Sequence, residues 1–324
     1  MSKIRTDLAL EARELASANA GELPGVSGDT ITFENMTVHR VHILNEEGSS
    51  RMGKPVGDYI TVELPREVAV DPARLKEGVS VISHELAELL GKTDLRSVLV
   101  VGLGNESVTP DALGPRTVKY TMVTRHLETE MPEYFEDASL RSVAALAPGV
   151  LGQTGVETAE VIKGLCERVK PSAVIVVDAL AARRLTRLAT TVQLSNTGIN
   201  PGSGVGNNRA EISEKTLGVP VVAIGVPTVV NAATLTSDVV GIVAENIRRN
   251  IKGSSDIFSF LGDYEPDEVH GLVRESLAPF DLDLFVTPKD IDTVILNLSK
   301  LVGFSINATL QRGVTIEEME HFVS

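Results

Sequence analysis

The chain has 324 residues, of which 43 % are apolar and 23 % are charged, and its formal net charge is −14 at pH 7. This length suffices for one large domain or two smaller ones, and the one cysteine, Cys166, excludes an intrachain disulfide and fits a reducing cytoplasm. The acidic charge argues against binding to nucleic acid or to an anionic membrane, and no run of about 18 apolar residues predicts a membrane span.

The N-terminal part predicts a helix followed by strands. Asp7 stands at the N-cap position of a helix over 7–18, whose apolar residues recur at helical spacing. Residues 30–45 and 58–64 alternate apolar with polar side chains, which predicts strands, and the Gly- and Ser-rich segment 48–57 between them predicts a loop. We therefore expect a β-rich N-terminal elaboration of antiparallel strands with one solvated face.

The rest of the chain alternates short β-branched runs with helical segments. The predicted strands are 97–102, 142–147, 173–178, 190–194 and 219–226, and the predicted helices are 71–91, 111–124, 157–169, 233–250, 266–277 and 288–312. Near-continuous apolar strands that alternate with helices indicate a parallel sheet covered on both faces. We predict a single three-layer α/β domain with a mostly parallel central sheet, to which the antiparallel strands are added.

Two of the predicted strands are followed or closed by an aspartate. Asp111 opens the helix after strand 97–102, and Asp178 is the last residue of strand 173–178. Ligands of open α/β sheets bind beyond the carboxyl ends of the strands. Two carboxylates that converge there can share a proton, which supplies an acid and a base to activate water against a peptide carbonyl. The alternative is that each aspartate is only the N-cap of the following helix.

Two glycine-rich segments carry less specific signals. The segment that begins at Gly102 has Ser107 where a dinucleotide-binding fingerprint needs its third glycine. The loop 201–209 lacks the G-K-[ST] ending of a phosphate-binding loop. This loop is either a close approach of backbone to backbone or a wall that brings N–H donors near a substrate carbonyl, and in the second case Ser203 and Gly204 bind substrate.

A metal site is the alternative chemistry for the two carboxylates. His126 follows the helix opened by Asp111 and can join Asp111 and Asp178 as a third ligand, although a lone histidine is more often structural. The segment 83–89, SHELAEL, has Glu88 where the H-E-x-x-H motif needs its second histidine, so it predicts a solvated helix face. The primary prediction therefore contains no cofactor, and a divalent metal is left open.

Several long and unusual stretches stand out: IRTDLALEARE, GLGNESVTPDALGPRTVKYTMVTRHL, APGVLGQTGVETAEVIKG, VDALAARRL and NTGINPGSGVGNNRAEISEKTLGVPVVAIGVPTVV. Together with the segments 275–292 and 305–310, they resemble the germination proteases of spore-forming bacteria. The resemblance implies an endopeptidase of the spore core cytoplasm, a homotetramer, that degrades small acid-soluble spore proteins during germination. It also implies an atypical aspartic mechanism with Asp111 and Asp178 as the catalytic residues, and neither nucleic acid nor membrane as a partner.

The resemblance further implies an inactive precursor that removes its own N-terminal segment. The processing site lies in the R-T-D-L-A stretch, which places the cut between Asp7 and Leu8. Residues 1–7 are then a propeptide, and 8–324 are the single α/β peptidase domain.

Substrates of the family are cut after an acidic residue that is followed by a large apolar residue and alanine. A basic side chain should hold the acidic residue, and Arg183, five residues after Asp178, is our candidate. The family is also similar in fold to hydrogenase-maturation endopeptidases, which bind a metal through acidic residues and a histidine. Where the resemblance predicts histidine in an H-P-G-S-G stretch, this chain has Asn200, which argues against a metal ligand at that position.

Overall fold

The computed structural model describes residues 6–20, 23–33, 35–91, 93, 95–202, 209–250, 272, 275–276, 284–311 and 313–323. The strands are β1 (Val26–Phe33), β2 (Met36–Ile43), β3 (Gly57–Glu63), β4 (Ser97–Gly102), β5 (Ser142–Leu146), β6 (Ala173–Ala182), β7 (Thr191–Ser195), β8 (Val221–Asn231) and β9 (Phe285–Val286). The helices are α1 (Ala9–Ala20), α2 (Glu46–Met52), α3 (Arg66–Val70), α4 (Leu75–Leu90), α5 (Leu113–Lys119), α6 (Arg125–Glu130), α7 (Pro132–Asp137), α8 (Leu151–Thr154), α9 (Thr158–Val169), α10 (Glu214–Leu217), α11 (Ala232–Asn250), α14 (Ile291–Leu310) and α15 (Ile316–Val323), with short 3-10 turns at η1 (Pro72–Arg74), η2 (Thr109–Asp111) and η3 (Leu185–Arg187).

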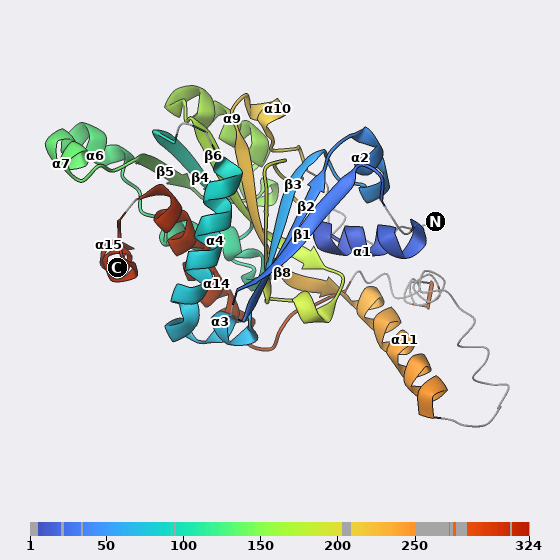
Figure 1. Ribbon diagram of the computed structural model, residues 1–324. Helices are drawn as coiled ribbons and strands as arrows, with labels where there is room; N and C mark the ends of the chain where they lie inside the picture. Colours follow the sequence, from blue (N-terminus) through green and yellow to red (C-terminus); the bar gives the residue numbers. More distant parts are fainter. Residues whose placement is uncertain are drawn as a thin grey trace.

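All of these strands belong to one sheet in the order β1-β2-β3-β7-β8-β6-β4-β5, with β9 paired to β8 (Figure 1). The strands β5, β4, β6 and β8 are parallel and form the centre of the domain. The antiparallel strands β1 to β3 continue the same sheet, because β3 pairs with β7 and β7 pairs with β8. The predicted fold class is confirmed: a three-layer α/β fold with a parallel core and an antiparallel N-terminal extension.

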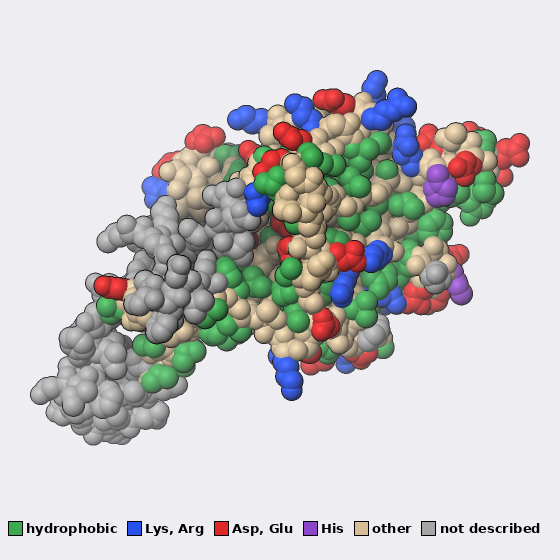
Figure 2. Space-filling model, turned by 180° about the vertical axis from the view of Figure 1, so that it is seen from behind, with side chains coloured by type: hydrophobic (Ala, Val, Ile, Leu, Met, Phe, Trp, Pro, Cys, Tyr) green, Lys and Arg blue, Asp and Glu red, His purple; other side chains and the backbone are tan. Residues whose placement is uncertain are grey.

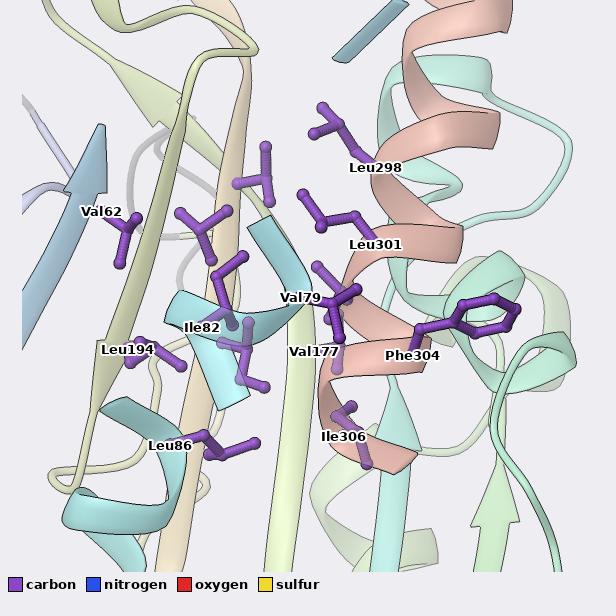
Figure 3. Packing of buried hydrophobic residues seen from close by; sticks show 14 of the residues in the cluster. Val62, Val79, Ile82, Leu86, Val177, Leu194, Leu298, Leu301, Phe304 and Ile306 are labelled. Atoms are coloured by element: carbon purple, nitrogen blue, oxygen red, sulfur yellow. The ribbon is translucent and has the colours of Figure 1, made fainter. Parts of the chain in front are cut away.

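Helices α4 and α14 cover one face of the sheet. Their apolar side chains meet those of β3, β6 and β7 in the large cluster of Figure 3, which includes Val62, Val79, Ile82, Leu86, Val177, Leu194, Leu298, Leu301, Phe304 and Ile306. The other face is covered by α9, where Ile162 and Cys166 pack against Leu99 and Val174. Cys166 is therefore a buried core residue, as its position in the middle of a helix suggests.

Among the residues that the structure describes, one helix, α14, is long and apolar enough to span a membrane, and 72 % of its apolar stretch is buried inside the structure. Burial of this kind is typical of the core helix of a folded domain. On the molecular face seen in Figure 2, acidic and basic side chains are interspersed among apolar ones.

The structure corrects three local predictions. Residues 46–52 of the predicted loop region form α2, because the Asn45 side chain accepts the N-cap hydrogen bond from Gly48 N and Gly53 ends the helix at a φ of 63°. Strand β6 does not end at Asp178 but continues to Ala182. Helix α1 begins at Ala9, so Asp7 precedes the N-cap position. The helix predicted over 266–277 lies outside the described residues, apart from 272 and 275–276.

Candidate active site

Strand β6 extends beyond the end of its neighbour β4. The last paired residues are Gly102 and Val177, and Leu103 N donates to Val177 O at 2.8 Å. Backbone groups of alternate strand residues point to the same side, so Val177, Ala179 and Ala181 all face the side that β4 leaves open. We call residues 178–182, seen from this side, the β6 edge.

The two predicted aspartates meet at the β6 edge. Asp178 is 6 % exposed, and its Oδ1 accepts a hydrogen bond from the next amide, Ala179 N, at 3.0 Å. Asp111 ends η2, which contacts both β6 and β8, and its Oδ2 accepts a hydrogen bond from Asn105 N at 2.7 Å. Each carboxylate thus takes one backbone donor, and neither caps a helix through its side chain in these contacts.

Two glycines allow the backbone of α5, which follows η2, to contact the ends of β4 and β6 closely. A Cβ on Gly114, in α5, would lie 2.5 Å from Leu103 N and 2.6 Å from Val177 O. A Cβ on Gly102 would lie 2.1 Å from Gly114 O. The backbone of α5 therefore rests directly on the ends of β4 and β6, and the preceding turn holds Asp111 beside them.

The surroundings of the two carboxyls favour protonation. Burial raises the pKa of Asp178 well above its usual range, and the negative charges of Asp111 and Asp7 raise it further. Burial also raises the pKa of Asp111, against the opposing effect of the hydrogen bond from Asn105 N.

The N-terminal segment docks on the same edge. Asp7 N donates to Ala181 O at 3.2 Å, and Ala181 N donates to Asp7 Oδ2 at 2.9 Å. The Asp7 carbonyl oxygen accepts hydrogen bonds from Lys54 Nζ at 2.9 Å and from Gln193 Nε2 at 3.1 Å. The peptide bond predicted to be cut is thus fixed on both sides, at the strand that carries Asp178.

The residues after this bond are enclosed. Leu8 is fully buried in a cluster with Leu180, Ala182 and Val230. Ala9 is fully buried against a second cluster, which contains Val41, Ile43, Met52 and Tyr59. Leu8 and Ala9 therefore pack into two separate apolar clusters, in the order of the sequence.

A buried carboxylate anchors the first turn of α1. Glu11 is 1 % exposed, and it accepts hydrogen bonds from Arg183 N at 2.8 Å and Arg184 N at 2.9 Å. The next turn is held by Arg187, whose Nη2 lies 2.5 Å from Glu14 Oε1. Sequence reasoning did not find Glu11, Lys54 or Gln193, because their partners lie far away in the chain and no local motif marks them.

The other predicted site residues differ in where they lie, and the first of them, Arg183, directly follows the β6 edge. The Arg183 guanidinium forms an ion pair with Asp238, with its Nη2 3.3 Å from Asp238 Oδ1. His126 is exposed in α6, and among the described residues no group of three His, Cys, Asp or Glu side chains forms a metal site, so the set Asp111, Asp178 and His126 is not brought together. Ser203 and Gly204 lie outside the described residues.

The predicted solvated face of the SHELAEL segment is wrong at one position. Glu85 is fully buried, because its carboxylate accepts hydrogen bonds from Arg40 Nη2 at 2.7 Å and Arg40 Nε at 3.0 Å. Glu88 is exposed. The segment thus fastens α4 to β2 and has no part in the site.

An α/β fold with one buried and one half-buried carboxyl near a docked peptide bond fits a peptidase. The chain matches the family described as germination protease over residues 5–258 and 250–323, and it belongs to this family. This confirms the resemblance stated from the sequence, and it supports a protease with a role in spore germination.

Relatives of the same name match along almost the whole chain. The germination protease of Caldanaerobacter subterraneus subsp. tengcongensis is 48 % identical over 99 % of this chain and 98 % of its own. Those of Clostridium perfringens (44 %, with complete coverage of both chains) and Oceanobacillus iheyensis (38 %, over 99 % and 97 %) follow. A solved [NiFe] hydrogenase maturation protease, HycI from Thermococcus kodakarensis KOD1, is 12 % identical with a TM-score of 0.27 over 61 % of this chain and 99 % of its own.

Proposed function

We propose that the chain is a self-processing aspartic endopeptidase that degrades small acid-soluble spore proteins when spores germinate. Membership of the germination protease family supports the protease role. The observation that carries the mechanism is that Asp111 and Asp178 meet at the β6 edge, where the Asp7 backbone is also hydrogen-bonded. Residues 1–7 are then the propeptide, and 8–324 are the peptidase.

The surroundings of the two aspartates assign Asp178 the role of general acid and Asp111 the role of general base. Asp178 is the more deeply buried and is flanked by negative charge, so it holds the shared proton and donates it as a hydrogen bond toward the scissile carbonyl. Asp111, which accepts a backbone hydrogen bond, is ionised and takes a proton from the attacking water. The water oxygen bonds to the carbonyl carbon, and the C–N bond breaks as a proton passes to the leaving amine.

The docked segment also gives the specificity. The pocket around Leu8 fits a large apolar residue after the cut, and the one around Ala9 fits alanine. Small acid-soluble spore proteins are then cut after an acidic residue by a cytoplasmic homotetramer of the spore core, without a cofactor and without binding nucleic acid or membrane. Light scattering of the purified protein tests the tetramer, and cleavage of a spore-protein peptide with the sequence Asp-Leu-Ala tests the specificity.

The central test follows the precursor by intact-mass spectrometry at mildly acidic pH. We expect the wild-type chain to lose residues 1–7, and Asp111→Asn and Asp178→Asn to stay intact, because each removes one partner of the acid pair. Asp137→Asn, at an exposed position in α7, is the matched control and should process normally. The proposal fails if both site variants process at the wild-type rate. Loss of processing in EDTA, with recovery on adding zinc, would favour the metallopeptidase alternative.

A further inference from the structure

We infer that Lys54 and Gln193 are catalytic residues that polarise the scissile carbonyl and bind the oxyanion formed when water attacks it. The inference rests on the proposed function, since it takes Asp7–Leu8 as the bond that is cut. Neither residue belongs to the acid pair, and neither is part of a motif that the sequence reveals.

The geometry is that of a two-donor oxyanion site. Lys54 Nζ lies 2.9 Å from the Asp7 carbonyl oxygen, and Gln193 Nε2 lies 3.1 Å from the same atom. Donors at these distances from an oxygen that gains negative charge stabilise the transition state more than the ground state. The Asp7 amide and carboxylate are bonded separately to Ala181. The Asp7 carbonyl oxygen thus has two side-chain donors of its own, while the charge of the Asp7 carboxylate also acts on Lys54.

The orientation of the Gln193 amide is fixed by the segment itself. Ala9 N donates to Gln193 Oε1 at 2.5 Å, and a backbone N–H can only be satisfied by the oxygen of the amide. The NH2 group must then point toward the Asp7 carbonyl. Since Gln193 is 9 % exposed and belongs to the central part of the sheet in β7, its donor is held in place before the reaction begins.

Lys54 brings a basic group to a half-buried position beside the Asp7 carbonyl oxygen. It directly follows Gly53, the left-handed residue that ends α2, so the turn after this helix aims it at Asp7. Burial lowers the pKa of Lys54, and the negative charges of Asp7 and Glu11 act in the opposite direction. A charged donor with little competing water stabilises an oxyanion more strongly than an exposed lysine would.

The alternative is that both side chains only hold the segment in place. The two roles predict different effects on docking and on the processing rate when the side chain is removed. If Lys54 only holds, its removal slows processing to the extent that the segment leaves the β6 edge. If Lys54 polarises the carbonyl, processing slows while the segment remains docked.

The test compares Lys54→Met, Lys54→Arg and Gln193→Glu with wild type in the full-length precursor. The first-order rate of losing residues 1–7 is measured by intact mass, at protein concentrations that differ tenfold, so that cleavage within one molecule is separated from cleavage between molecules. Lys76→Met, at an exposed position in α4, removes a lysine without touching the site. We expect Lys54→Met and Gln193→Glu to slow processing by about 10²–10³-fold. Lys54→Arg should retain more of the rate because it keeps a charged donor, and Lys76→Met should retain all of it.

Docking is measured in the same proteins by hydrogen exchange of the peptide that covers residues 6–14. Each substitution is placed in the Asp178→Asn chain, so that no cleavage occurs during labelling. Retained protection together with slow processing supports the inference. A wild-type rate in Lys54→Met, or a loss of protection as large as the loss of rate, overturns it. Asp111→Asn and Asp178→Asn in the same rate assay test the proposed function separately, because they report on the acid pair whatever the Lys54 result.

Discussion

At the scale of single residues, the carboxyl of Asp178 couples stability to pH. Its pKa is raised in the folded chain by burial and by the charges of Asp111 and Asp7. The folded state therefore binds this proton more tightly than the unfolded state does, and the free energy of unfolding falls as pH rises from about 4, the ordinary range of an aspartate, through the raised pKa.

Asp178→Asn removes this dependence while keeping the shape of the side chain. We expect the variant to be more stable than wild type at neutral pH, and the difference to vanish as pH falls toward the ordinary aspartate range. Urea denaturation across pH measures it, on samples whose mass shows the unprocessed chain. The exposed Asp137→Asn should show no such trend. A variant that is less stable than wild type at neutral pH would contradict the assignment of Asp178 as a buried acid whose ionisation lowers the free energy of unfolding.

The sequence predicts these residues unequally. Asp111 and Asp178 were found because carboxyl ends of parallel strands share an edge, a rule that holds without knowing the packing. Lys54, Gln193 and Glu11 make their contacts at separations of 47, 184 and 172 residues along the chain. Such contacts depend on how the N-terminal segment crosses the finished sheet, and no spacing within the sequence encodes them.

At the scale of elements, capping residues form a helix in a segment whose composition predicts a loop. The Gly- and Ser-rich stretch after β2 suggested a loop, yet Asn45 and Gly53 supply an N-cap and a left-handed C-cap for α2. A pair of caps outweighs weak helix propensity over two turns. The continuation of β6 past Asp178 was missed because its later residues, Leu180 to Ala182, are held by β8 and by the N-terminal segment, both distant in sequence.

The contact of α5 with the sheet gives a test at this scale. Gly114→Ala places a methyl group against Leu103 N and Val177 O, which are backbone atoms that cannot move aside cheaply. We expect a loss of about 1–3 kcal/mol in the free energy of unfolding, as for an overpacked core. Processing should also slow, because η2 and Asp111 shift with α5.

The matched control is Gly164→Ala in α9, where an added Cβ meets nothing within 4 Å. Replacing a helical glycine by alanine without a clash should stabilise by roughly 0.5–1 kcal/mol. Urea denaturation of both variants decides the comparison. Equal stability of the two would show that α5 can move away from the strands, and that the close backbone contact does not position Asp111.

At the scale of the whole molecule, α1 joins two parts of the sheet. Leu8 packs with side chains of β6 and β8, and Ala9 packs with those of β2 and β3. The N-terminal segment therefore spans the boundary between the parallel core and the antiparallel strands. Cutting before Leu8 changes the electrostatics of this junction, because hydrolysis creates an α-carboxylate on Asp7 beside Lys54 Nζ and a positively charged α-amino group on Leu8. When residues 1–7 leave, the carboxylate leaves with them, and the α-amino group remains at a fully buried position near the Lys54 side chain.

Burying this charge costs free energy, because the nearby buried carboxylate of Glu11 already accepts hydrogen bonds from Arg183 N and Arg184 N, and the Lys54 cation adds repulsion. We expect the first turn of α1 to withdraw after processing, which opens the pockets of Leu8 and Ala9 to substrate. Hydrogen exchange of residues 8–14 should be faster in the processed chain than in the Asp178→Asn precursor incubated in parallel, while the peptides of β4 and β6 stay protected. If residues 8–14 keep their protection after the cut, the new amino group is accommodated where it forms, and access of substrate to the β6 edge must come from another part of the molecule.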